Sequence, residues 1–264
     1  MPSPTTPLLR PKPSQTRTSS SLALLQMPNQ SHTPTTNLDA LLRDITLGFS
    51  DGLTVPFALT ASLSISGSTK IVIMGGLAEL FSGMISMGLG AYNVAITEKG
   101  HWEVEYQRTL EGVRDDPETE RRGVVEVLGR FGVGEESDAM RKVVREIMAD
   151  EETWVEFAME VGRGLVRPEE GRAVVSAVTM GVSYFVGGLV PMLPYFFMAG
   201  RAREALGVSV GIAVVVLLAF GFAKSWVTVR NKKAGVWGAL QTLVIGAVAA
   251  GTSYGVVRLV DGIE

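Results

Sequence analysis

The sequence contains no cysteine and only two histidines among its 264 residues. Because cysteine is absent, disulfides, thiolate metal sites and cysteine nucleophiles are all excluded. Any metal ion that the chain binds must therefore be held by carboxylates, methionine sulfur, backbone oxygen or the two histidines. The lack of cysteine does not by itself identify a cellular compartment.

Charge is scarce, with 19% of residues charged and 46% hydrophobic, and this composition excludes a disordered protein. The formal net charge of −3 hides a strong segregation, because eighteen of the 27 acidic residues fall between positions 98 and 167. The chain has neither a phosphate-binding loop nor a nucleophile elbow, and we do not expect an enzyme.

Long apolar runs lie on both sides of this acidic segment. Each run holds the roughly 20 residues that a helix needs to cross a hydrocarbon core of about 30 Å. The runs lie near residues 42–65, 71–96, 172–199, 206–229 and 235–260. We therefore predict an all-α, polytopic membrane protein with five transmembrane helices, two within residues 38–97 and three within residues 169–264.

Residues 98–168, called the charged region below, hold eighteen acids and eleven bases, a net charge of −7. Apolar residues recur here at helical spacing, and Asp116-Pro117-Glu118 is typical of a helix start. The first such stripe is Val124, Val127, Leu128 and Phe131. We predict a small cytosolic helical domain between the second and third spans.

Residues 1–37, rich in Ser, Thr and Pro, are predicted to be a disordered cytosolic tail.

Basic residues in the short flanks indicate the orientation of the spans. Arg43 and the basic residues after the fourth span fall on the same side as the charged region, which favours a cytosolic location for that side and for the amino terminus. Arg201 and Arg203 fall on the opposite side and argue mildly against this assignment.

Two isolated carboxylates, Asp51 and Glu79, lie inside the first two spans. A carboxylate at membrane depth is costly, and it usually faces a partner, a cavity or an ion path. Glu79, Gly83 and Met87 follow at i, i+4 and i+8, so they share one helix face. Carboxylate oxygen suits Mn²⁺ and Fe²⁺, and thioether sulfur favours transition metals. The alternative for Met87 is simple membrane packing, as for its neighbour Met84.

The residues around these positions resemble those of the vacuolar iron transporter family, which includes the yeast-type calcium-sensitivity complementing and nodulin-21-like transporters. The similar motifs are Gly48-Phe49-Ser50-Asp51-Gly52-Leu53, Gly76-Leu77-Ala78-Glu79-Leu80, Ile85-Ser86-Met87-Gly88, Pro117-Glu118-Thr119-Glu120 and Ser183-Tyr184-Phe185. The resemblance extends over about residues 38–259, nearly everything but the tail.

The resemblance implies a homodimer with a metal path between protomers, located in the vacuolar membrane. It also implies export of Fe²⁺ or Mn²⁺ from the cytosol into the vacuole in exchange for protons. Asp51, Glu79 and Met87 stand at the family's transport positions. Zn²⁺ and Co²⁺ are further possible substrates. We expect no resident cofactor and no nucleic-acid partner.

The charged region departs from the family's pattern of metal-binding glutamates. Glu120 is retained, whereas five expected ligand positions hold Thr109, Gly112, Gly123, Ala158 and Gly162. A site for several metal ions needs many oxygen donors at once, and we predict only weak binding to this degenerate domain. The predicted metal ligands are therefore Asp51, Glu79, Met87 and Glu120. An alternative function is a non-transporting membrane scaffold or metal sensor, although the intact Asp51 and Glu79 argue against it.

Overall fold

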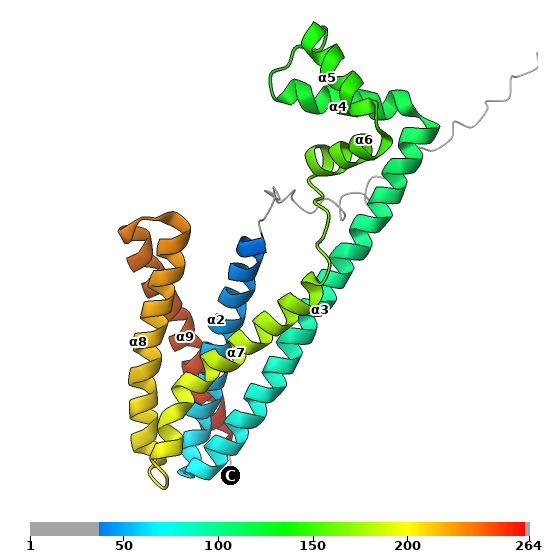
Figure 1. Ribbon diagram of the computed structural model, residues 1–264. Helices are drawn as coiled ribbons and strands as arrows, with labels where there is room; N and C mark the ends of the chain where they lie inside the picture. The colour runs from blue at the N-terminus through cyan, green and yellow to red at the C-terminus, as the bar shows by residue number, and fades with distance from the viewer. Residues whose placement is uncertain (1–36, 262–264) are drawn as a thin grey trace, which may run out of the picture. The chain divides into compact units, whose positions relative to one another are not determined.

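The computed structural model describes residues 37–261, and all regular secondary structure in this range is helical. The five longest helices are α2 (Asn37–Leu63), α3 (Thr69–Asp115), α7 (Arg172–Phe197), α8 (Ala202–Val229) and α9 (Lys232–Asp261), shown in Figure 1. The predicted all-α class is confirmed. The predicted tail lies outside the described residues, apart from Asn37.

Four helices of the described chain, α3, α7, α8 and α9, are long and apolar enough to cross a membrane. α2 has the necessary length, but four charged residues interrupt its apolar positions: Asp39, Arg43, Asp44 and Asp51. The predicted count of five spans therefore stays a prediction.

α2 is the central helix of the bundle formed by these five helices, because it packs against each of the other four (Figure 1). Its closest neighbour is α7, and glycines permit that approach. A Cβ atom on Gly52 would lie 2.1 Å from the carbonyl oxygen of Tyr184, and one on Gly187 would lie 2.7 Å from that of Phe49. Any larger residue at these positions would push α2 and α7 apart, and the two helices carry site residues.

A short polar turn joins α2 to α3. A short 3₁₀ helix, η1 (Ser64–Ser66), leads to Gly67, whose φ of 72° suits glycine, and the Ser68 side chain caps α3. The turn between α7 and α8 lies beside it, since the backbone N–H of Gly200 donates to Thr69 Oγ1 at 3.0 Å. These two turns therefore mark one end of the bundle.

α3 does not end where the membrane span was predicted to end, near Ile96. It continues as a single helix of 47 residues to Asp115, so the bundle and the charged region share one element (Figure 1). The reason lies in the sequence, because no proline interrupts the helix before Pro117.

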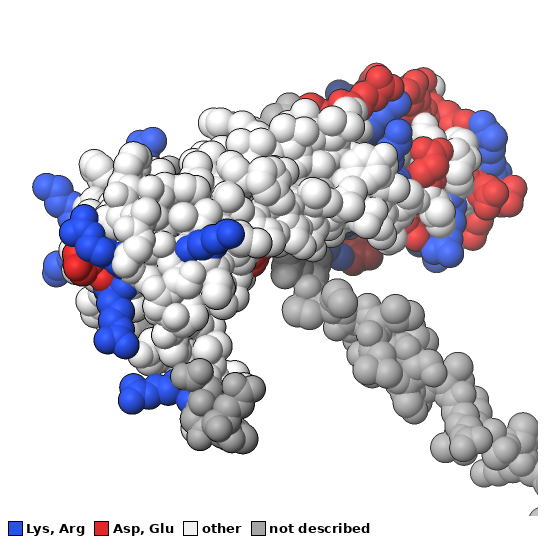
Figure 2. Space-filling view, turned by 90° about the horizontal axis from the view of Figure 1, so that it is seen from below, with Lys and Arg blue, Asp and Glu red and all other residues white. Residues whose placement is uncertain are grey.

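The remainder of the charged region folds as α4 (Pro117–Arg130), α5 (Asp138–Met148), α6 (Glu151–Phe157) and a single turn of π-helix, η2 (Ala158–Gly162). These elements enclose an apolar core with α3, built from Trp102, Val113, Val124, Met140, Val144, Trp154, Val155 and Met159. Phe131, which the first stripe placed inside, is 75% exposed because α4 ends at Arg130. Figure 2 shows acidic and basic side chains crowded on this region, whereas the bundle surface is largely uncharged.

Aspartates begin two of these helices, as the helix-start motif predicted for α4. The Asp116 side chain accepts a hydrogen bond from the backbone N–H of Thr119, and Asp150 does the same for Thr153. Hydrogen bonds from the hydroxyl and the backbone of these threonines lower the pKa of both aspartates below the usual value. The caps are therefore strongest when both carboxylates are charged.

Candidate metal site

The three membrane residues predicted to bind metal line one cavity of about 380 Å³. α2 contributes Asp51 and α3 contributes Glu79 and Met87. The other lining residues are Val55, Ser82, Gly83, Ser86 and Tyr184. The predicted fourth ligand, Glu120, belongs to α4 in the charged region and does not line this cavity.

Glu79 is held by one of its carboxylate oxygens and leaves the other unsatisfied. The Tyr184 hydroxyl donates to Glu79 Oε1 at 2.5 Å. Glu79 Oε2 is buried and has no hydrogen-bond partner within residues 37–261. A buried carboxylate oxygen without a donor is costly, and a cation in the cavity would remove that cost. Glu79 therefore has the properties of a cation ligand.

Tyr184 owes its position to Gly83. A Cβ atom on Gly83 would lie 2.3 Å from the Tyr184 ring and 2.5 Å from its hydroxyl, so only glycine leaves room for the ring at this level of α3. The tyrosine is itself buried. The sequence interpretation placed Gly83 on the same helix face as Glu79 and Met87, and it assigned no role to Tyr184. The spacing of residues along α3 cannot predict a contact with a side chain of α7.

Asp51 occupies a more open part of the cavity. Asp51 is exposed in the single chain, and its carboxylate has no hydrogen bond or ion pair among the described residues. The hydroxyl of Thr54, one turn later, donates instead to the carbonyl oxygen of Ser50 at 3.1 Å. Both carboxylates of the site therefore retain oxygen atoms that are free to bind a cation.

Two serines of α3, Ser82 and Ser86, were missed by the sequence interpretation. They lie three and seven residues after Glu79 and line the same cavity, so their hydroxyl oxygens add neutral donors beside Met87. Helical spacing could have identified both serines, because positions i+3 and i+7 from Glu79 lie on the same helix face as positions i+4 and i+8. No cluster of three or more His, Asp or Glu side chains suitable for a metal occurs in the described part of the chain.

Asp44 was also missed, although it lies two turns before Asp51 on α2. It is 2% exposed, and the Ser176 hydroxyl of α7 donates to its Oδ2 at 2.5 Å. Its other oxygen lies 3.5 Å from the Arg43 guanidinium, without a hydrogen bond. Asp44 is outside the lining of the cavity, so we place it beside the site and not in it.

Glu120 lies near Thr109 and Gly112, two of the positions where the family has metal ligands. The positive charge beside these residues is that of an arginine, Arg163. The Arg163 guanidinium lies 3.8 Å from Glu120 and 3.4 Å from Glu105, and it donates to the Thr109 hydroxyl at 2.5 Å. Gly112 faces the same carboxylate, since a Cβ there would lie 2.9 Å from Glu120 Oε1. The positive charge at this junction of α3, α4 and η2 therefore belongs to the chain itself.

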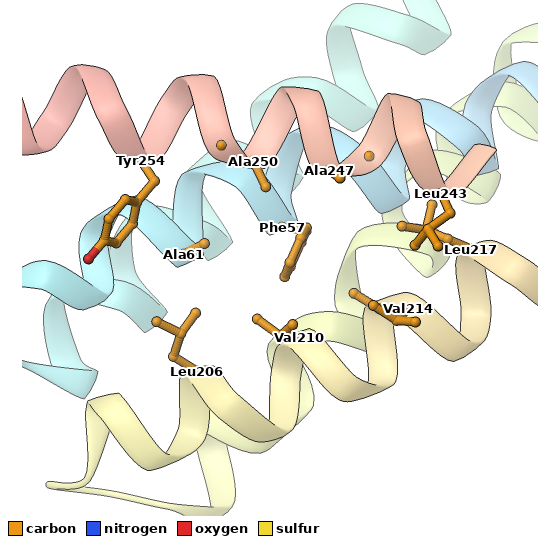
Figure 3. Close-up of a pocket in the computed structure, with 13 residues that line it drawn as sticks. Phe57, Ala61, Leu206, Val210, Val214, Leu217, Leu243, Ala247, Ala250 and Tyr254 are labelled. Carbon is orange, nitrogen blue, oxygen red and sulfur yellow. The ribbon is translucent and has the colours of Figure 1, made fainter. Parts of the chain in front are cut away.

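A second cavity of about 300 Å³ lies between α2, α8 and α9 (Figure 3). Apart from the Tyr254 hydroxyl, its labelled lining side chains are hydrocarbon. A cation needs oxygen, nitrogen or sulfur donors, so this cavity is not a candidate for metal.

Comparison with known proteins finds a matching family model and several similar proteins. The model of the VIT family matches residues 42–258. A vacuolar iron transporter of Centaurea cyanus is 43% identical over 218 residues, which is 82% of this chain and 86% of that protein. Vacuolar iron transporter 1 of Oryza sativa subsp. japonica is 40% identical over 84% of this chain and 86% of its own length. Protein CCC1 of Saccharomyces cerevisiae is 38% identical over 83% of this chain and 69% of its own length.

Proposed function

The chain belongs to the VIT family, and we propose that it carries Fe²⁺ from the cytosol into the vacuole, with Mn²⁺ as a second substrate and protons moving the other way. Its relatives named as vacuolar iron transporters support the iron substrate and the multi-pass vacuolar membrane location. The family's transporters are not enzymes, in agreement with the absence of an enzyme motif.

The observation that carries this proposal is the unsatisfied oxygen of Glu79 in a cavity shared with Asp51 and Met87. Two carboxylates supply the charge that offsets dehydration of a divalent ion. Met87 sulfur disfavours Mg²⁺ and Ca²⁺ relative to Fe²⁺ and Mn²⁺, and it also admits Zn²⁺ or Co²⁺. Tyr184 fixes one oxygen of Glu79, so the other oxygen is presented to the ion.

The charges that line the cavity support the proposed proton exchange. The lining contains Asp51 and Glu79 and no basic side chain. A divalent cation neutralises the pair, and after it leaves two negative charges remain at membrane depth, where they are costly. Protons are the simplest replacement, since a carboxylate in an apolar environment is more easily protonated than in water. Metal and protons would then alternate on the same oxygens.

A homodimer would complete the site. Asp51, Ser82 and Ser86 are all exposed in the single chain, so one side of the cavity is not closed by its own helices. The donors of a single chain also lie on one side of the cavity, whereas an ion that has lost its water needs donors all around it. A second copy placed against this side of α2 and α3 would close the path and double the number of ligands.

We further propose that α2 is the first of five spans, surrounded by protein and therefore able to carry charge. The charged region and the amino terminus would then lie in the cytosol. The net charge of −7 on residues 98–168 would raise the local concentration of divalent cations near the entrance without storing them.

Uptake by the purified protein in liposomes tests the proposal. Fe²⁺ and Mn²⁺ uptake are measured with and without an imposed proton gradient, for the wild-type chain and for Asp51→Asn and Glu79→Gln. Both variants keep the size of the side chain and remove its charge, and we expect each to abolish uptake. Glu204→Gln, at an exposed position at the start of α8, is the matched control and should transport normally.

The possible results separate the parts of the proposal. Wild-type rates in both cavity variants would disprove the assigned path. Uptake that ignores the proton gradient would remove the exchange mechanism but not the metal site. If folded wild-type protein takes up neither metal, the scaffold or sensor function becomes the better explanation.

A further inference from the structure

The apolar cavity between α2, α8 and α9 has the length of one lipid acyl chain. Its lining runs from Leu206 to Leu217 on α8 and from Leu243 to Tyr254 on α9 (Figure 3). Eleven helical steps correspond to about 16 Å at 1.5 Å per residue. A hydrocarbon core of about 30 Å allots about half of that to each leaflet. The cavity therefore spans one leaflet.

The lining also determines what can fill the cavity. Phe57 and Ala61 of α2 face the side chains of α8 and α9, and a hydroxyl occurs only at the Tyr254 end (Figure 3). A water molecule needs two or more polar partners to be stable in a cavity, and this lining does not supply them. An occupant of this lining would therefore be hydrocarbon. A helix of a second copy, about 10 Å across with its side chains, would occupy about 1,300 Å³ over a length of about 16 Å. This is several times the cavity volume of about 300 Å³.

Basic residues gather at the end of the cavity that Tyr254 and Leu206 mark. Arg258 follows Tyr254 by one turn on α9, and Arg203 precedes Leu206 by one turn on α8. This end of α8 follows the α7–α8 turn, which is hydrogen-bonded to the start of α3, where Lys70 lies. Figure 2 looks onto this end and shows blue side chains around it.

Among the described side chains, Arg201 is the only basic residue at this end with an acidic partner. Glu204 lies 3.3 Å from Arg201, an exposed pair. No ion pair involves Arg203 or Arg258 among the described side chains. Arginines at the membrane surface attract anionic headgroups. The apolar length and the charge at its end therefore fit the two parts of a single molecule.

We propose that this cavity binds an acyl chain of an anionic glycerophospholipid, whose phosphate lies on Arg203 and Arg258. The lipid fills the space between α2 and the α8–α9 pair. It therefore supports the face of α2 that carries Phe57, away from the face that carries Asp51. This inference does not rest on the direction or the substrate of transport.

Native mass spectrometry of the full-length protein, purified in detergent and exposed to equal amounts of phosphatidylglycerol and phosphatidylcholine, tests the proposal. Gly251→Leu adds a side chain to the lining of the cavity, and a Cβ at Gly251 meets no atom within 4 Å. Gly255→Leu is the matched control, since its Cβ site is equally open but does not line the cavity. Arg258→Gln removes one of the headgroup charges.

We expect the wild-type chain to retain one phosphatidylglycerol in preference to phosphatidylcholine. Gly251→Leu should reduce this retention at least tenfold, and Gly255→Leu should not change it. Arg258→Gln should weaken phosphatidylglycerol binding about fivefold and should weaken phosphatidylcholine binding less, because the choline cation already offsets the phosphate charge. Ala247→Leu, also in the lining, should repeat the loss if Gly251→Leu proves unstable.

Three results would overturn the inference. Equal retention in Gly251→Leu and Gly255→Leu would mean that bound lipid is only general boundary lipid. Equal retention of the two lipids by the wild-type chain would remove the role of the arginines. A loss of dimer mass in Gly251→Leu alone would assign the cavity to a contact between copies.

Discussion

Replacement of Gly83 by alanine should disable the site without touching a ligand. Gly83 lies between Glu79 and Met87 on α3, and its Cβ would fall 2.3 Å from a ring carbon of Tyr184. Cβ atoms essentially never come this close to another heavy atom, so the ring must move. The Tyr184 backbone cannot yield, because its carbonyl oxygen lies against Gly52 of α2. The hydroxyl would therefore leave Glu79.

The size of the effect follows from three contributions. Overlap in a packed interior costs about 1–3 kcal/mol. Loss of a hydrogen bond to a charged group costs about 1.5–3 kcal/mol more. Alanine is favoured over glycine inside a helix by about 1 kcal/mol, which partly offsets the loss. The free energy of unfolding should therefore fall by about 1.5–5 kcal/mol, and Fe²⁺ uptake should fall at least tenfold.

Gly90→Ala is the matched control, because it lies on the same helix and its Cβ site meets no atom within 4 Å. Unfolding of both variants in denaturing detergent, followed by circular dichroism, and Fe²⁺ uptake in liposomes measure the two effects. Gly90→Ala should be as stable as the wild-type chain or slightly more stable. If Gly83→Ala matches Gly90→Ala in both assays, Tyr184 does not pack on α3 and does not position Glu79.

Three further predictions concern single side chains. Met87→Ala should shift the preference among Fe²⁺, Mn²⁺ and Zn²⁺ in competition uptake and reduce the flux only mildly, since the carboxylates remain. Arg163→Gln should lower the melting temperature of the charged region more than Arg108→Gln, because Arg163 contacts three partners and Arg108 pairs with Glu105 alone; equal melting temperatures in circular dichroism would contradict this. The lowered pKa values of Asp116 and Asp150 mean that their caps stabilise the folded state above about pH 4 and are lost as the pH falls further. The melting temperature should therefore drop below that pH, and Asp150→Asn, which still caps but does not titrate, should weaken the drop.

The helices could be predicted because each depends on local information. Apolar runs of sufficient length specified the long helices. The motif at Asp116-Pro117 specified the start of α4. The end of the second span could not be predicted in the same way, because a change from apolar to charged residues alters the environment of a helix without ending it. α3 needed Pro117 to stop.

The ligands on one helix could also be predicted, but the contacts between helices could not. Spacing on α3 put Glu79 and Met87 on one face, and Ser86 was within reach of the same argument. Tyr184 comes from a helix that begins more than 90 residues later than Glu79, and its hydrogen bond depends on how closely α7 approaches. That approach is determined by backbone contacts at glycines, which no single-helix pattern describes.

Arg163 illustrates the same limit in the charged region. The resemblance to the family identified positions where glutamate is missing, and from these alone a loss of metal binding was predicted. The sequence did not reveal that an arginine after η2 reaches Glu105 and Glu120 from another element. Missing ligands and a nearby arginine both weaken metal binding. Only the arginine explains why the carboxylates of Glu105 and Glu120 lie close together.

The two acidic parts of the chain therefore differ in how their charge is balanced, and this difference bears on where an ion would bind. In the charged region many carboxylates lie beside arginines, as in the pairs Glu118–Arg121 at 3.2 Å and Glu126–Arg130 at 2.7 Å. Such exposed pairs add little stability, but a metal ion must compete with a cation that is tethered one turn away. The cavity in the bundle has no basic residue in its lining, and within the described part of the chain one buried oxygen of Glu79 has no hydrogen-bond partner. The binding free energy of a divalent ion is more favourable where no arginine has to be displaced. This favours binding at Asp51 and Glu79 over binding at Glu120.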